Sequence, residues 1–129
     1  MVSWASHKQK HTADSSCYAE YIAIHNATHE VLFFHQFLDG LNIPLFTATP
    51  LYCDNDAACQ LTEDQRHHSK IKHIHIHYHS THKLVELDEL KVLQVSSSEN
   101  TADILTKALG PNDFAHLRSY LGICHAHVA

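Results

Sequence analysis

Three acidic residues have the side chains and the settings that metal-dependent chemistry requires. One of them, Asp54, follows the short apolar run Pro50–Cys53, whose β-forming residues predict a buried strand. A carboxylate at the end of a buried strand is held rigidly, and Mg²⁺ demands oxygen ligands in near-octahedral geometry. Alternatively, Asp54 is the N-cap of a short helix that we expect from about residue 55 to about residue 61.

The other two carboxylates, Glu20 and Asp103, fall in different predicted elements. Glu20 lies early in a predicted helix, where a lone glutamate more often faces solvent and interacts with the helix dipole. If folding brings both residues to Asp54, the three suit a pair of divalent ions roughly 3.5–4 Å apart, which supports in-line attack of water on a phosphodiester. Spacing alone does not establish this site, because three carboxylates can be chosen from any chain.

Histidine forms a second candidate cluster, since the chain contains 15 His residues. Four of them alternate along one segment. If this segment is a strand, the four histidines share one face; if it is a helix, they form two i, i+4 pairs, each able to chelate Zn²⁺. They are His73, His75, His77 and His79. We expect a helix over residues 70–88, because its apolar stripe is longer, and keep the strand as the alternative. That stripe comprises Ile71, Ile74, Tyr78, Thr81 and Val85.

The elements that would position these residues alternate between strands and helices. Residues 2–8 predict a strand, and a helix from about Ser16 to about Asp39 follows, with Ser15 or Asp14 as N-cap and Gly40 as C-cap. The inward stripe of this helix is expected to be Tyr21, Ile24, Thr28, Val31, His35 and Leu38.

The second half continues the same alternation. Residues 41–49 form a connection, residues 51–53 and 91–95 predict strands, and residues 102–109 predict a helix closed by Gly110-Pro111. A last helix is expected from about Asn112 to Leu121. We therefore expect one domain over residues 1–122 and a frayed tail over 123–129.

Composition limits the class of protein. A chain of 129 residues with 44% apolar residues can bury roughly two-thirds of its unfolded surface as one globular domain. With neither a long apolar run nor a signal peptide, we expect no membrane association and a cytoplasmic or nuclear location with free thiols. A net charge of −5 argues against a strong nucleic-acid footprint at neutral pH, and hence against a non-catalytic nucleic-acid binder.

Five sequence blocks occur in an order that closely resembles the ribonuclease H region of copia-type retrotransposon polyproteins. They are Val2–Gln9, Ser15–Ala23, Leu51–Asn55, His68–Ile74 with Tyr78-His79, and Thr101–Lys107. The resemblance extends to about Gly122. It implies an α/β, ribonuclease H-like fold with a mixed sheet flanked by helices. It also implies metal-dependent cleavage of the RNA strand of an RNA–DNA hybrid, alongside the reverse transcriptase portion of the polyprotein.

The resemblance assigns roles to individual residues. It implies that Glu20, Asp54 and Asp103 are catalytic ligands of two Mg²⁺ or Mn²⁺ ions, with Glu20 and Asp54 on one ion and Asp103 on the other. Contacts to the hybrid are expected from Asn55, Lys70, Lys72, His73 and Lys107.

The chain also departs from the family pattern. Two strands, the first bearing a further aspartate that bridges both metals, should precede Val2 and are absent. Each buried backbone group that loses its partner costs about 1–3 kcal/mol, so we expect marginal folding and little or no activity from this chain alone. Histidines replace charged residues of the family at His75, His77 and His82. Because histidine is mostly neutral at pH 7, this change would weaken binding to the phosphates of the hybrid. The alternative function is a His-rich module for divalent metals or protein partners, without catalysis.

Overall fold

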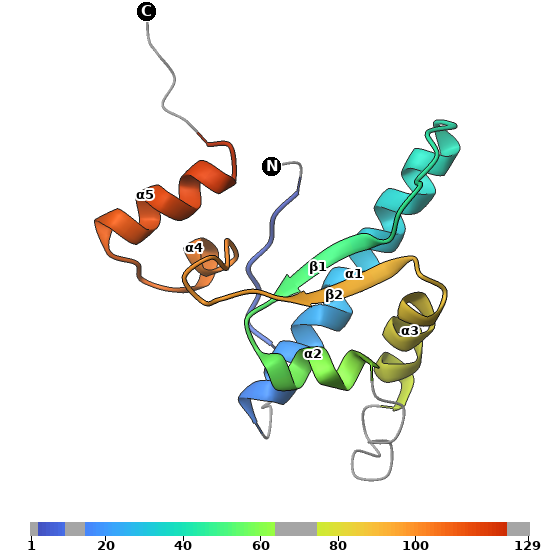
Figure 1. The fold of residues 1–129 in the computed structure, drawn as a ribbon, viewed down its shortest axis with the longest axis horizontal. Coiled ribbons are helices and arrows are strands. Elements are labelled where there is room, and N and C mark those ends of the chain that lie inside the picture. Colours follow the sequence, from blue (N-terminus) through green and yellow to red (C-terminus); the bar gives the residue numbers. More distant parts are fainter. Residues whose placement is uncertain (1–2, 10–14, 64–74, 124–129) are drawn as a thin grey trace, which may run out of the picture. The chain divides into compact units, whose positions relative to one another are not determined.

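The computed structural model describes residues 3–9, 15–63 and 75–123, with side chains for all of these except 75–79. The chain divides into two compact units, and each is described by itself. The larger unit comprises residues 13–94, and the smaller unit combines residues 1–12 with residues 95–129. Figure 1 shows the elements in chain order. Within the described residues, no helix is both long and apolar enough to cross a membrane.

The long helix α1, Ser16–Gly40, is the main support of the larger unit. The side chain of Ser15 accepts a hydrogen bond from the backbone N–H of Tyr18 at 3.2 Å, which confirms Ser15 as the N-cap. The predicted inward stripe is buried at Tyr21, Ile24 and Thr28, and its later members are half-buried. The predicted helix is confirmed, and its first half faces the core.

The end of α1 differs from the prediction, because Gly40 is the last helical residue and not the cap. Asn42 adopts the left-handed conformation, with φ of 57°, and its N–H donates to the carbonyl of Asp39 at 2.9 Å. The N–H of Ile43 donates to the carbonyl of Leu38 at 2.9 Å. These two bonds form a Schellman motif, in which asparagine replaces glycine because its short polar side chain tolerates this conformation.

Two strands pair in parallel in the larger unit: β1, Thr49–Cys53, and β2, Leu90–Gln94. Leu51 lies opposite Val92 in their register. A parallel pair needs a crossover connection, which here contains α2, Asp56–Glu63, and α3, His75–Glu86. The predicted strands at 51–53 and 91–95 are confirmed to within two residues, and the described part of the His-rich segment is helical, as expected.

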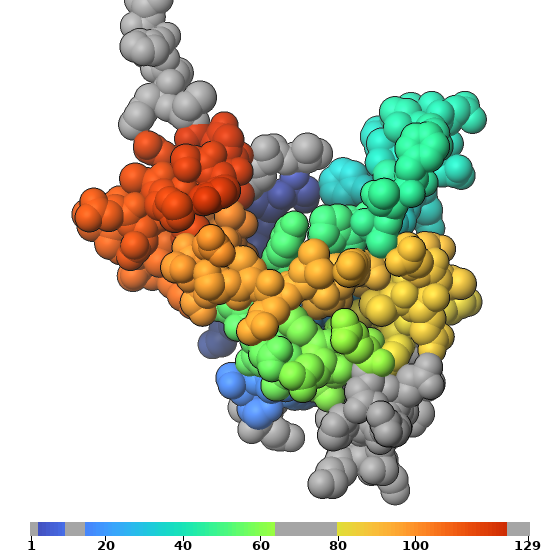
Figure 2. All heavy atoms as spheres, viewed as in Figure 1, coloured from blue at the N-terminus to red at the C-terminus, as the bar shows by residue number. Residues whose placement is uncertain are grey.

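The core of the larger unit lies where α1, α2 and α3 pack around the two strands. Among the described residues, its buried members are Ile24, Cys53, Ala58, Cys59, Leu84, Leu90 and Val92. Beyond it, the end of α1 and residues 41–48 form a lobe that projects from this unit (Figure 2). Large apolar side chains on this lobe are exposed, including Phe33, Phe37 and Phe46.

The smaller unit contains α4, Asp103–Thr106, and α5, Pro111–Tyr120. The helix predicted over 102–109 is thus only four residues long, because Lys107 takes an extended conformation. Gly110 and Pro111 do not close it; they are the N-cap and first residue of α5, where proline loses no hydrogen bond.

The strand predicted over residues 2–8 is wrong for the residues that the structure describes. Residues 3–9 have no regular secondary structure, and Trp4 is 64% exposed. An extended segment becomes a stable strand only when a neighbouring strand takes up its backbone hydrogen bonds. The described residues thus form a mixed helix–sheet structure with two parallel strands, and the ribonuclease H-like sheet remains a prediction.

Candidate functional site

Glu20 is positioned by the second turn of α1 and is half-buried. Its neighbour Tyr21 is 1% exposed and anchors this turn of the helix against Tyr18 and Leu61. Because side chains one residue apart on a helix point about 100° away from each other, burying Tyr21 leaves Glu20 at the margin of the packed face.

Asp54 directly follows β1, as the sequence predicts. The adjacent Cys53 is buried, and the next residue, Asn55, accepts a hydrogen bond through Oδ1 from the backbone N–H of Ala58 at 3.1 Å. Asn55 is therefore the N-cap of α2. The alternative prediction that Asp54 caps this helix is wrong.

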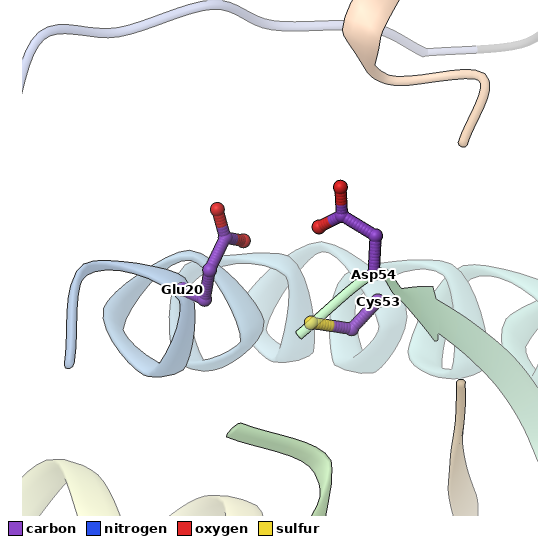
Figure 3. Close-up of side chains that lie close together, drawn as sticks. All are labelled: Glu20, Cys53 and Asp54. Atoms are coloured by element: carbon purple, nitrogen blue, oxygen red, sulfur yellow. The ribbon is translucent and has the colours of Figure 1, made fainter. Parts of the chain in front are cut away.

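The structure brings Glu20 and Asp54 together. One carboxylate oxygen from each and the sulfur of Cys53 all lie within 4.8 Å of one another. In Figure 3 the two carboxylates extend to the same side of α1, while the sulfur lies below them. Two carboxylates arranged in this way offer the oxygen ligands that Mg²⁺ and Mn²⁺ prefer.

The Cys53 thiol is a neighbour of this pair that the sequence interpretation missed. Burial raises the pKa of Cys53, and the charges of Glu20 and Asp54 raise it further, against the opposing effect of a hydrogen bond with the Asn55 backbone. A thiol with a raised pKa stays protonated at neutral pH, and neutral sulfur is a poor ligand for hard cations. The donors that fit Mg²⁺ here are therefore the two carboxylates.

Asp103, the third predicted ligand, is the first residue of α4 in the smaller unit. Its side chain is 8% exposed, and Oδ2 lies 2.7 Å from the ammonium nitrogen of Lys107. Within its own unit, Asp103 is thus a buried carboxylate with a cationic partner. Its approach to Glu20 and Asp54 remains a prediction.

The residues predicted to contact nucleic acid divide into three groups. Lys70, Lys72 and His73 lie outside the described residues. Asn55 caps α2, and Lys107 pairs with Asp103. In the predicted transition-metal cluster, the backbones of His75, His77 and His79 belong to α3, and their side chains are outside the described set.

Comparison with known proteins identifies related sequences, but no protein family and no related structure. Neither a family model nor a solved structure matches the chain. The chain is 35% identical to the retrovirus-related Pol polyprotein from transposon TNT 1-94 of Nicotiana tabacum, over 122 residues. It is 37% and 35% identical to the corresponding polyproteins from transposons RE1 and RE2 of Arabidopsis thaliana.

These matches cover 95% of this chain, whereas the chain spans only 8 to 9% of the length of the relatives. The described helices and strands, including those that carry Glu20 and Asp103 and the strand that precedes Asp54, therefore lie in the part of the chain that aligns with these polyproteins. The chain is a homologue of a short part of plant transposon Pol polyproteins.

Proposed function

We propose that this chain is a ribonuclease H-type piece of a copia-type transposon polyprotein. Its activity would be metal-dependent hydrolysis of the RNA strand of an RNA–DNA hybrid. The observation that carries the proposal is the meeting of Glu20 on α1 with Asp54 at the end of β1. The similarity to transposon Pol polyproteins over 95% of the chain supports the family setting.

The two carboxylates would hold one divalent ion by their oxygens. A bound Mg²⁺ or Mn²⁺ polarises the phosphate and lowers the pKa of the attacking water. Glu20 would fix the position of the ion from the helix side and Asp54 from the strand side, because neither residue lies at a free end of the chain. Such fixed ligands need no reorganisation when the substrate phosphate arrives.

Asp103 would serve a second ion, as the sequence resemblance implies. In the described residues its carboxylate pairs with Lys107, so ion binding would have to compete with that ammonium group. Because the second ion would have to displace Lys107 from Asp103, we propose that cleavage by this chain is slow.

The hybrid substrate would approach a chain with a net charge of −5, so repulsion between like charges should weaken its binding. A divalent ion between Glu20 and Asp54 would offset part of that charge at the point where a phosphate must come closest. The reverse transcriptase portion of a polyprotein is the natural source of further hybrid contacts.

Cleavage of a labelled RNA–DNA hybrid, with Mg²⁺ or Mn²⁺ and with a chelator, tests the proposal. The wild-type chain should cut the RNA strand slowly, and the chelator should stop it. Asp54→Asn should lose at least about 100-fold, because even residues behind metal ligands cost 10- to 100-fold when changed.

Asp56→Asn is the matched control, since Asp56 is exposed in the first turn of α2 and accepts a hydrogen bond from Gln60 at 2.7 Å. This variant should cut as the wild type does. A wild-type chain that cuts no faster than Asp54→Asn in either metal would contradict the proposal.

A further inference from the structure

A second pair of side chains, of a type that can bind metals, lies about one turn further along α1. His25 and His29 place their Nε2 atoms 3.2 Å apart. The two rings are nearly perpendicular, at 81°, with their centroids separated by 4.7 Å. The i, i+4 spacing puts both residues on one face of the helix, the same logic that predicted chelation at His73 and His77.

This nitrogen separation fits a tetrahedral metal ion. Two Zn–N bonds of about 2.0–2.1 Å, meeting at a tetrahedral angle, put the nitrogens roughly 3.3–3.4 Å apart. The observed 3.2 Å is close enough that small ring rotations would complete the chelate. Imidazole is a preferred ligand for Zn²⁺, Cu²⁺ and Ni²⁺, whereas the carboxylate pair at Glu20 and Asp54 favours Mg²⁺ and Mn²⁺.

The His25 ring is held in place from its other side. His25 is 5% exposed, and its Nδ1 lies 3.3 Å from the Thr81 hydroxyl and 3.3 Å from the Ser80 hydroxyl, both on α3. A hydrogen bond at the far ring nitrogen is the arrangement that fixes the orientation and tautomer of metal-bound histidines. A buried, fixed ring reduces the entropy lost when a metal binds.

A metal ion could reach the pair from solvent at His29, because this residue is exposed. Without a metal, the contact between the two Nε2 atoms is a hydrogen bond that needs one proton between them. Metal binding at both Nε2 atoms requires that this proton move to Nδ1 of the same ring, so the donor histidine would change its tautomer.

We propose that His25 and His29 form a binding site for Zn²⁺ or a similar imidazole-preferring ion. The two protein nitrogens fill two of four positions, and water fills the others, so the ion exchanges with solvent. The site uses none of the residues of the predicted cluster at 73–79, and it does not rest on the proposed nuclease activity. Because His25 contacts α3, a bound ion would also stabilise the packing of α1 on that helix.

Titration with Zn²⁺ alone tests this site, with equal numbers of imidazoles in the variants compared. His29→Gln removes one exposed ligand of the pair. His116→Gln is the matched control, because His116 is exposed on α5 and its ring contacts Tyr120, not another histidine. Both variants retain 14 of the 15 histidines, so nonspecific binding by the His-rich segment is the same.

The wild type and His116→Gln should bind Zn²⁺ at a site that His29→Gln lacks. In NMR spectra, Zn²⁺ should shift the ring resonances of His25 in the first two proteins and leave them unchanged in the third. Zn²⁺ should also raise the thermal unfolding midpoint of the first two only, because it binds the folded pair. Equal binding isotherms and equal shifts in the two variants would overturn the proposal.

Discussion

The carboxylates of Glu20 and Asp54 lie within 4.8 Å of each other, although one belongs to α1 and the other follows β1. Two negative charges at such a distance repel each other, by about 1 kcal/mol in a water-like medium and by more where water is excluded. A divalent cation between them would turn this repulsion into attraction.

The first prediction follows from that repulsion. In a chelator, Asp54→Asn should raise the free energy of unfolding by up to about 1 kcal/mol, because one of the two charges is gone. In Mg²⁺ the wild type should gain stability and the variant should not. Urea unfolding with and without Mg²⁺ measures both effects, and Asp56→Asn is the control. A variant that is less stable than the wild type in chelator would contradict the repulsion.

Asn55 is expected to act in stability, not in substrate binding. Its Oδ1 caps α2, so Asn55→Ala should cost about 1 kcal/mol of unfolding free energy, and Asn55→Ser should restore most of it. Urea denaturation of the three proteins provides the measurement. If Asn55→Ala matches the wild type in stability but binds an RNA–DNA hybrid less tightly, the predicted nucleic-acid role would be the correct one.

The larger unit should be sensitive to truncation of a single core side chain. Leu90, on β2, is 1% exposed, so Leu90→Ala should cost about 2–5 kcal/mol, a large share of the stability of a typical domain. Leu87→Ala, at a position that is 55% exposed, should change stability by less than about 0.5 kcal/mol. Equal midpoints for these two variants in urea would show that β2 is not packed as described.

The buried thiols predict a loss of stability in alkali. Burial raises the pKa of Cys59 from 9.0 to about 12, and the neighbouring Cys53 adds to the rise. Above pH 9 the unfolded chain loses this proton while the folded chain keeps it, so stability should fall as the pH rises from 9 toward 12. Cys59→Ala should make this decline shallower. Unfolding free energies at several values of pH over this range measure the slope, and identical slopes would exclude the thiol as the cause.

The elements whose pattern is local could be predicted from the sequence. The spacing from Tyr21 to Thr28 located the buried face of α1, and the run before Asp54 located β1. Both signals depend on the periodic burial of side chains, which the sequence records directly.

Features that depend on neighbours in space could not be predicted in the same way. The segment around Trp4 has a strand-like pattern, but a strand also needs a partner, and residues 3–9 form none. The choice between Gly40 and Asn42 at the end of α1 depends on where the last helical hydrogen bond falls. The pairing of His25 with His29 follows from their i, i+4 spacing in the sequence. The contact of His25 with Thr81 on α3 depends on how the two helices pack, and the spacing does not predict it.

The most direct test of the central claim is the binding of Mn²⁺ at Glu20 and Asp54, observed as paramagnetic broadening in NMR spectra of the chain. We predict that broadening centres on the resonances of these two residues and the adjoining backbone. It should persist in Asp56→Asn and disappear in Asp54→Asn. Broadening that is absent there in the wild type, or that survives Asp54→Asn unchanged, would contradict a shared divalent ion at this pair.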